Sequence, residues 1–97
     1  MAKGYWVVQV DVADPEAYAV YRSSVGPSLE AFGGRFIVRA GAQETPEGRA
    51  RPRTVIIEFP SYQAARDCYD SPAYQEVRAL RLAASEADFT LVEGCDP

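Results

Sequence analysis

The order in which strand-like and helix-like segments follow one another is the strongest constraint on the fold of this chain. Lys3–Val12 (KGYWVVQVDV) is rich in β-branched and aromatic residues, which is typical of a central strand. Three shorter segments have the same character, namely Arg35–Ala40, Arg53–Phe59 and Ala87–Val92. Helix-like segments separate the first strand from the second and the third from the fourth. This β-α-β-β-α-β order, with right-handed crossovers, predicts the α+β ferredoxin-like fold, a four-stranded antiparallel sheet with both helices on one face.

The first helical segment carries a start signal and a stop signal. Asp14–Glu16 supplies an N-cap, a proline for the first turn and an acidic residue. Apolar residues then follow at spacings of three and four, which places them on one helical face. Pro27 interrupts this run, so we expect a kink or a break there. Gly33–Gly34 is expected to end the helix, with one glycine in the left-handed conformation.

The second helical region is predicted to consist of two parts. Ser61 is expected to cap a helix that runs to about Asp70, and Ser71–Pro72 then restarts or bends it. Gly41–Pro52 has little apolar content, so we expect a mobile loop that joins the two middle strands as a hairpin. The chain has 97 residues, which suffice to bury one hydrophobic core, and no linker divides it. We therefore expect a single domain over residues 1–97.

The alternation of side chains along each strand divides the sheet into two faces. The more apolar set is expected to face the helices: Trp6, Val8, Val10, Val12, Phe36, Val38, Val55, Ile57, Phe59, Phe89 and Leu91. The opposite set includes both arginines of the second strand, yet it also contains Val7, Ile37, Ile56 and Val92. Two copies packed face to face as a homodimer would bury this half-apolar face. The alternative is a solvated face with scattered aliphatic side chains, which is ordinary on monomers.

Charge and residue usage exclude several classes of function. The net charge is −4, which disfavours binding to the phosphate backbone of a nucleic acid. The absence of His removes the commonest general base, metal ligand and haem ligand, so we expect no cofactor and no metal site. Cys68 and Cys95 form no C-x-x-C motif, which fits a reduced, cytoplasmic location. The apolar stretches are far too short to span a membrane, so no membrane partner is expected.

Four short motifs resemble one known family when they are taken together. They are Gly33-Gly34-Arg35-Phe36, Glu58-Phe59-Pro60-Ser61, Tyr69-x-Ser71-Pro72-x-Tyr74 and Glu93-Gly94. In this combination they resemble the bacterial family of the domain of unknown function 1330, within the dimeric α+β-barrel superfamily, over nearly the whole chain. The resemblance implies a ferredoxin-like protomer and a homodimer whose sheets form a barrel, but no assigned reaction. The wider superfamily is similar to cofactor-free monooxygenases of antibiotic biosynthesis, small isomerases and stress-induced barrels. Cys68 departs from the family, which often has an aromatic residue at this position.

Glu58 is the candidate general base. It is expected to lie late in a central strand, near Arg35 and Arg39 of the neighbouring strand and with Asp11 on its other side. If these groups face a closed dimer interior, loss of solvent would perturb the pKa of the carboxylate, as a general base requires. The alternative is a ladder of cross-strand ion pairs that fixes the strand register or closes the dimer.

The break in the second helical region is the other candidate site. Tyr69 and Tyr74 flank it and could line a pocket for a small polar or aromatic ligand; alternatively, Ser71 only caps the helix and both rings pack in the core. Arg78 and Arg81 lie one turn apart and could clamp a carboxylate, or could lie along apolar surface or pair with acidic residues.

Two hypotheses for the function follow from these residues. In the first, a cytosolic homodimer binds a small organic molecule between sheet and helices and acts without a cofactor, in a monooxygenase-like or isomerase-like way. Its pocket would be lined by Arg35, Glu58, Tyr69, Tyr74 and Arg81, with Glu58 as the base. In the second, the chain is a non-catalytic binding or assembly module. A cavity with converging polar groups favours the first hypothesis, and a filled interior favours the second.

Overall fold

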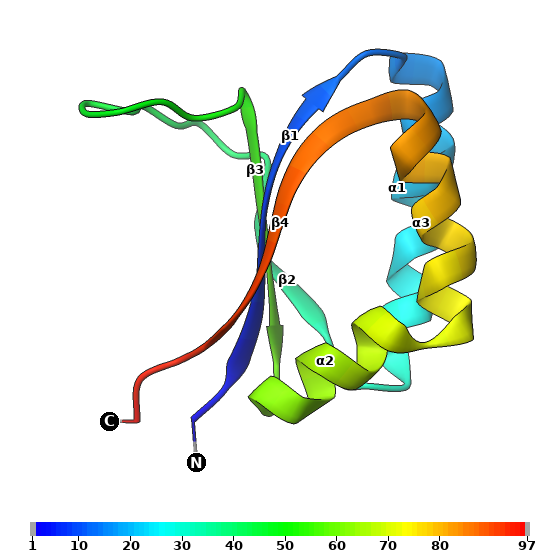
Figure 1. The fold of residues 1–97 in the computed structure, drawn as a ribbon, viewed down its shortest axis with the longest axis vertical. Helices are drawn as coiled ribbons and strands as arrows, with labels where there is room; N and C mark the ends of the chain where they lie inside the picture. The colour runs from blue at the N-terminus through cyan, green and yellow to red at the C-terminus, as the bar shows by residue number, and fades with distance from the viewer. Residues whose placement is uncertain (1, 97) are drawn as a thin grey trace.

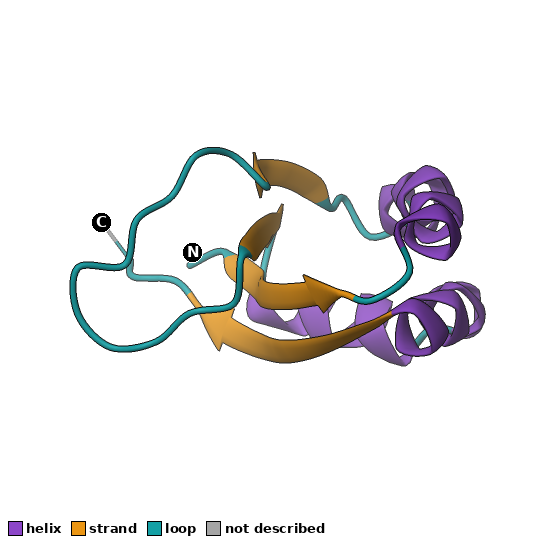
Figure 2. Cartoon of the chain, turned by 90° about the horizontal axis from the view of Figure 1, so that it is seen from above, coloured by secondary structure: helices purple, strands orange, loops and turns teal. Residues whose placement is uncertain are grey.

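The computed structural model describes residues 2–96, which form four strands and three helices in the expected order (Figure 1). The strands are β1 (Gly4–Val12), β2 (Arg35–Arg39), β3 (Arg53–Phe59) and β4 (Ser85–Glu93). The helices are α1 (Pro15–Glu30), α2 (Tyr62–Asp70) and α3 (Pro72–Ala84). The strands form one antiparallel sheet in the order β2-β3-β1-β4, and the helices lie on one side of it (Figure 1, Figure 2). This is the predicted ferredoxin-like α+β architecture.

Each helix begins at a side chain that caps it, as the sequence predicts. Asp14 Oδ1 accepts a hydrogen bond from the Ala17 N–H (3.1 Å) at the start of α1. The hydroxyl oxygens of Ser61 and Ser71 accept equivalent bonds at the starts of α2 and α3. The Ser71 hydroxyl also donates to the carbonyl of Cys68 (2.6 Å), so this residue both ends α2 and starts α3. The change of direction lets α2 cover one end of the sheet while α3 lies beside α1 (Figure 1).

α1 runs through Pro27 without the break that the sequence suggested. A proline inside a helix removes one backbone hydrogen bond and costs about 3 kcal/mol or more. Tyr18 and Tyr21 before it and Leu29 after it are buried in the same core. Burial of a large apolar side chain contributes roughly 1.5–3 kcal/mol, so packing on both sides of the proline offsets its cost. The chain turns after α1 at Gly33, where a φ of +72° requires glycine, as expected.

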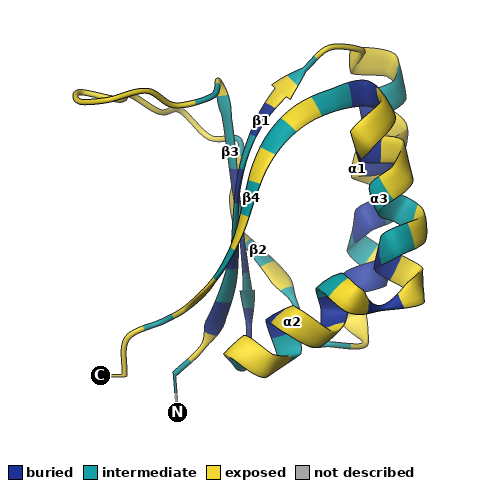
Figure 3. Cartoon of the chain, viewed as in Figure 1, coloured by how far each residue is buried: buried dark blue, intermediate teal, exposed yellow. Residues whose placement is uncertain are grey.

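The core lies between the helices and the sheet face that turns toward them (Figure 3). In β1 and β3 alternate residues are buried, as predicted: Trp6, Val8, Val10, Val55, Ile57 and Phe59. The indole Nε1 of Trp6 donates to the carbonyl of Ala65 (2.9 Å), which joins β1 to α2 and satisfies the buried donor. The Trp6 ring is surrounded by other aromatic rings, with centroids 4.7 Å from Tyr74 and 5.1 Å from Phe89.

A β-bulge in β2 changes the predicted faces of that strand. Phe36 lies opposite Ile57 on the helix side of the sheet. Beyond the bulge Arg39 lies opposite Val55, which is also on the helix side. One extra residue reverses the alternation that follows it. Val38, expected in the core, is therefore 37% exposed on the other face, and Arg39, expected on that other face, is turned toward the helices.

The sheet face turned away from the helices is called the open face below; none of the described helices covers it (Figure 1). It carries exposed apolar side chains: Ile37 is 45% exposed and Val92 is 42% exposed. Tyr5 and Glu58 lie opposite each other on this face. In the part of the chain that the structure describes, no helix has the length and apolar character needed to cross a lipid bilayer.

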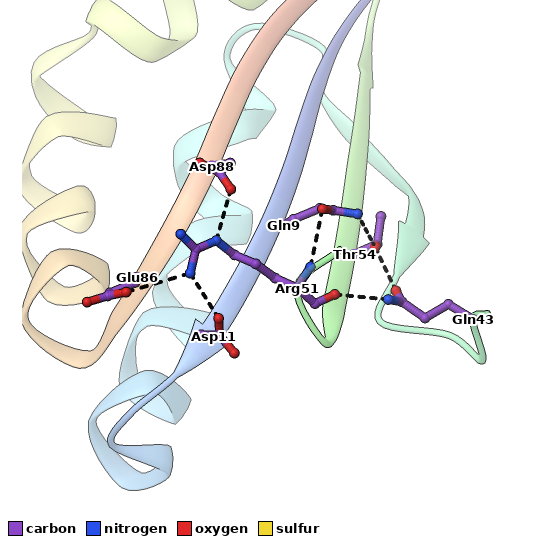
Figure 4. Close-up of polar contacts among 7 residues, drawn as sticks. All are labelled: Gln9, Asp11, Gln43, Arg51, Thr54, Glu86 and Asp88. Atoms are coloured by element: carbon purple, nitrogen blue, oxygen red, sulfur yellow. Dashed lines mark hydrogen bonds and ion pairs between the residues drawn. The ribbon is translucent and has the colours of Figure 1, made fainter. Parts of the chain in front are cut away.

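One arginine anchors the loop between β2 and β3 to the open face (Figure 4). Arg51 Nη1 lies 2.9 Å from Asp11 Oδ2, and its Nε lies 2.9 Å from Asp88 Oδ2. The loop is thereby tied to β1 and β4. Gln43 Nε2 donates to the Arg51 carbonyl (2.9 Å), and the Arg51 N–H donates to Gln9 Oε1 (3.3 Å). The loop expected over 41–52 is present, but Arg51 and Gln43 attach it to the sheet.

Candidate functional site

A narrow cavity, which opens to solvent, lies between the sheet and the helices. Apolar side chains form its walls: Trp6, Val8, Val25, Val55, Ile57 and Phe89. Polar side chains enter it from α1, the sheet and α3: Tyr18, Tyr21, Arg22, Arg39, Arg53 and Arg81. No carboxylate side chain is among the described residues that line it. We call it the arginine-lined cavity.

Arg81 is the most deeply placed of these arginines. It projects from α3, is only 4% exposed and lines the cavity. Its Nε donates a long hydrogen bond to the Tyr74 hydroxyl (3.4 Å), and its guanidinium carbon lies 5.1 Å from the centroid of the Phe89 ring. Among the described residues no carboxylate side chain lies within ion-pair distance of it. Arg81 is therefore a buried positive charge without an acidic partner, which is unusual because burying an unpaired ion is costly.

Two tyrosine hydroxyls lie beside Arg81 and do not neutralise it. The hydroxyl oxygens of Tyr21 and Tyr74 are 3.1 Å apart. Burial raises the pKa of Tyr21 strongly, and the neighbouring Tyr74 adds to that rise. Burial is also the main cause that raises the pKa of Tyr74. Both phenols are thus protonated at neutral pH, so the charge on Arg81 stays uncompensated and the hydroxyls act as hydrogen-bonding groups.

The other three arginines lie nearer the mouth of the cavity. Arg53 starts β3, its guanidinium carbon lies 5.3 Å from the Tyr18 ring centroid, and its Nε is buried with no hydrogen-bond partner. Arg39 Nη2 donates to the carbonyl of Arg22 (3.2 Å), and its guanidinium carbon lies 4.0 Å from the centroid of the Phe36 ring. The protein has a net charge of −4, yet the described residues that line this cavity carry only positive charges. Such a site attracts anions and focuses the local field.

Glu58 and Arg35 are brought together, but not at this cavity. They lie opposite each other in the register of β2 and β3, with Arg35 Nη2 2.8 Å from Glu58 Oε1. The Tyr5 hydroxyl donates to Glu58 Oε2 (3.3 Å). The hydrogen bond from Arg35 is the largest cause that lowers the pKa of Glu58. A lowered pKa makes a carboxylate a weaker base, so the geometry on the open face resembles the predicted ion-pair ladder more closely than a general-base site.

Two neighbours expected beside Glu58 lie elsewhere. Arg39 is turned to the helix side by the bulge in β2, where it lines the cavity. Asp11 lies opposite Glu86 near the far end of β1 and forms its ion pair with Arg51. The expected cluster around Glu58 is thus reduced to Arg35 and the unanticipated Tyr5.

Tyr69 lies behind the cavity rather than in its wall. Its ring packs 5.6 Å from Tyr74 and 5.1 Å from Phe89, measured between centroids. Its hydroxyl accepts a hydrogen bond from Arg78 Nε (3.0 Å). Arg78 therefore holds Tyr69 in place, while Arg81, one turn later on α3, points to the cavity.

Cys68 is buried, and its Sγ donates a weak hydrogen bond to the carbonyl of Ser28 (3.5 Å). Burial raises the pKa of the Cys68 thiol to about 12. A thiol with so high a pKa is not ionised at neutral pH and is a poor nucleophile. Cys68 is therefore an inert thiol of the core.

Sequence reasoning predicted Arg81 and Tyr74 as pocket-lining residues. Arg81 lines the cavity, whereas Tyr74 is fully buried outside its lining and accepts a hydrogen bond from Arg81. The other polar lining residues were missed. A signal for Arg53 was available, because the alternation that puts Val55 and Ile57 on the helix side also puts Arg53 there. The helical spacing of Tyr21 places its ring on the core-facing side of α1, which is correct, but gives no information about its hydroxyl group. Arg39 could not be found, because the bulge that redirects it has no obvious sequence signal.

The described residues contain no group of three or more Cys, Asp or Glu side chains placed to hold a metal ion.

No curated protein matches this sequence. A protein of unknown function from Rhodopseudomonas palustris has a similar structure (TM-score 0.77, 22% identity), covering 99% of this chain and 85% of that one.

Two further solved structures share the architecture at low sequence identity. SnoaB, a cofactor-independent oxygenase from Streptomyces nogalater, is similar over 100% of this chain and 97% of its own, with a TM-score of 0.68 and 14% identity. A Nitrosomonas europaea protein, provisionally named an antibiotic biosynthesis monooxygenase, covers 100% of this chain and 95% of its own, with a TM-score of 0.61 and 13% identity. At such identities these likenesses show the fold alone. The family model of the domain of unknown function 1330 matches residues 3–95, and the chain therefore belongs to that family.

Proposed function

We propose that the arginine-lined cavity binds a small organic molecule and that the chain acts on it without a cofactor, in a monooxygenase-like or isomerase-like reaction. The observation that carries this proposal is Arg81, a buried guanidinium that lines a cavity with apolar walls and has no acidic partner among the described residues. The name of SnoaB, a cofactor-independent oxygenase, adds support through the shared fold.

The side chains of the cavity suit chemistry in which negative charge develops on an oxygen atom of the bound molecule. Arg81 supplies a fixed positive charge, and the hydroxyl group of Tyr21, which also lines the cavity, supplies a neutral hydrogen-bonding group beside it. Preorganised donors of this kind stabilise an oxyanion more strongly in a desolvated site than in water. The described lining holds no carboxylate, so a substrate with an acidic proton fits this site best. For Glu58 we propose the alternative role, an ion pair with Arg35 that fixes the strand register on the open face.

The sole tryptophan of the chain makes the proposal testable. Trp6 lines the cavity, so its fluorescence reports occupancy without a label. We expect aromatic compounds to quench this fluorescence and to raise the melting temperature. Val25→Phe narrows the cavity from α1, and Val55→Met narrows it from β3; each is expected to abolish both effects. Val20→Phe, on the exposed side of α1, is the matched control and should bind as the wild type does.

We also propose that the open face joins two copies of the chain. It carries Ile37, Val38 and Val92, all more than a third exposed, and burying such a patch is favourable. Sedimentation equilibrium should then show a dimer. Val92→Glu is expected to weaken the dimer, whereas Leu82→Glu, at a more exposed apolar position on α3, should not. Monomeric wild-type protein would contradict this assembly.

The non-catalytic module remains the second candidate, because the exposed apolar open face supports assembly whatever the cavity does. A dimer that binds no compound in the cavity would favour it over the first candidate. A cytoplasmic location is part of either proposal and is supported by two thiols, Cys68 and Cys95, that are both free.

A further inference from the structure

We propose that the arginine-lined cavity selects organic anions: molecules with an aromatic-sized apolar body and a carboxylate, or another oxygen anion, that is bound by Arg81 and Arg53. This inference rests on the function proposed above and names its class of ligand. The inference assigns both residues as anion-binding groups. Arg53 comes from the start of β3 and Arg81 from α3, so two separate elements contribute to the same site.

The distribution of ion pairs separates most arginines of this protein into two groups. Arg49 and Arg78 belong to neither, because they have no carboxylate partner among the described residues and do not line the cavity. Arg35, Arg51 and Arg66 each lie within ion-pair distance of at least one carboxylate side chain, and none of them lines the cavity. The arginines that do line it have no such partner among the described residues: Arg22, Arg39, Arg53 and Arg81. Carboxylates are thus available in this acidic chain, but they are kept away from this cavity. The missing negative charge is what a ligand would supply.

Arg53 supports the same conclusion independently of Arg81. Its Nε is buried and has no hydrogen-bond partner, whereas buried donors in native proteins are nearly always satisfied. Solvent does not reach this atom in the unliganded protein, so an acceptor bonds to it only when the Arg53 side chain, which lines the cavity, turns toward the bound molecule. An acceptor oxygen of a bound anion would satisfy it, and a guanidinium group is suited to bind a planar carboxylate through two parallel hydrogen bonds.

The walls indicate what else the ligand carries. Trp6, Phe89 and Ile57 offer apolar surface, which favours a hydrocarbon or aromatic body over a small inorganic anion. Rings stack against aromatic walls, and the charged group then extends toward the guanidinium groups.

The competing explanation is that the arginines serve only the fold. Arg81 contacts the Phe89 ring and the Tyr74 hydroxyl, and Arg53 contacts the Tyr18 ring. Such cation–π contacts stabilise an arginine without any ligand. The two explanations differ in one respect: a purely structural arginine has no reason to distinguish a charged ligand from a neutral ligand of the same shape.

A matched pair of probes tests this difference. We would titrate 2-naphthoate and 2-naphthamide, which share size and shape but differ in charge, and measure binding through Trp6 fluorescence and calorimetry. Naphthoate is expected to bind at least about tenfold more tightly, because charge-assisted hydrogen bonds to arginine are lost in the amide. Sulfate alone is expected to bind weakly, because it lacks the apolar body. Equal affinities, or tighter binding of the amide, would overturn the anion class while leaving the proposed binding function intact; no binding of either probe would overturn both.

Variants connect the selectivity to the two residues. Arg53→Gln and Arg81→Gln are each expected to reduce the preference for naphthoate to less than about threefold, with a smaller effect on naphthamide. Arg81 is buried, so its variant is first checked for folding by circular dichroism. If Arg81→Gln does not fold, Arg53→Gln provides the test, because Arg53 lies at a partly exposed strand end. Arg66→Gln, on the exposed side of α2, is the control and should keep the full preference. An unchanged preference in Arg53→Gln would remove Arg53 from the site.

Discussion

The hydroxyl group of Tyr21 on α1 lies 3.1 Å from that of Tyr74 on α3 inside the core. Tyr74 has a second partner, because its hydroxyl accepts the long hydrogen bond from Arg81 Nε. The pair joins the two longest helices through polar atoms in an otherwise apolar layer. The two tyrosines therefore differ in how many partners lose a contact when a hydroxyl is removed.

Stability measurements on the two phenylalanine variants should show this difference. Tyr74→Phe leaves both Tyr21 and the Arg81 guanidinium without a partner, so we expect a loss of about 1–3 kcal/mol in the free energy of unfolding. Tyr21→Phe leaves the Tyr74–Arg81 contact in place and should cost less, about 0.5–1.5 kcal/mol. Urea denaturation measures both values, with the exposed Tyr62→Phe as control. A smaller loss for Tyr74→Phe than for Tyr21→Phe would contradict the geometry described here.

The same pair predicts a loss of stability at alkaline pH. A tyrosine in the unfolded chain has a pKa of about 10, whereas burial raises the pKa of Tyr21 and Tyr74 in the folded protein. Above that pH the unfolded chain releases protons that the folded protein retains, so the free energy of unfolding falls as the pH rises. Urea denaturation at about pH 8 and about pH 11 should show that the free energy of unfolding falls less between these pH values for Tyr21→Phe than for the wild type. A drop of the same size in both would argue against a buried phenol at this position.

A Glu58 variant tests whether this residue of the open face takes part in ligand binding at the cavity. Because Arg35 lowers the pKa of Glu58 in the folded protein, its contribution to stability is present above the unfolded pKa of about 4.3 and is lost as the pH falls through the lower folded value. Glu58→Gln should therefore flatten the acid side of the stability profile. The affinity of this variant for 2-naphthoate should stay within about twofold of that of the wild type. A tenfold loss of affinity would place Glu58 in the ligand site, as first predicted from the sequence.

The elements of the fold were predictable because their signals are local. The caps at Asp14, Ser61 and Ser71 each use a side chain within three residues of the N–H that it satisfies. The faces of β1 and β3 follow from strict alternation. Pro27 shows the limit of such signals, because the packing of α1 on distant residues outweighs the local preference of one proline.

The candidate site was harder to predict because it depends on contacts between distant segments. Arg39 reaches the cavity only through the bulge in β2, and the Tyr21–Tyr74 contact joins residues 53 positions apart. Arg81 was singled out for a possible carboxylate, yet its importance lies in the absence of an acidic partner within the described residues. Sequence spacing cannot show whether a charge is buried and unpaired, since that depends on every element around it.

The Arg51 contacts predict how the β2–β3 loop moves. Arg51 joins this loop to Asp11 and Asp88 on two strands (Figure 4). Exposed ion pairs contribute little to global stability, roughly 0.2–1 kcal/mol each, so Arg51→Ala should change the free energy of unfolding only slightly. Opening of the loop breaks these ion pairs, as well as the hydrogen bond between Gln43 and Thr54. Without Arg51, amide hydrogen exchange over residues 41–50 should therefore accelerate by roughly 2–10-fold. Arg49→Ala, at an exposed position in the same loop, is the control and should leave exchange unchanged.

High salt should reduce the difference in exchange rate between the wild type and Arg51→Ala, because it screens the ion pairs of Arg51. Equal exchange rates in the two proteins at low salt would mean that backbone contacts, such as that of Ala40 with Thr54, hold the loop without Arg51.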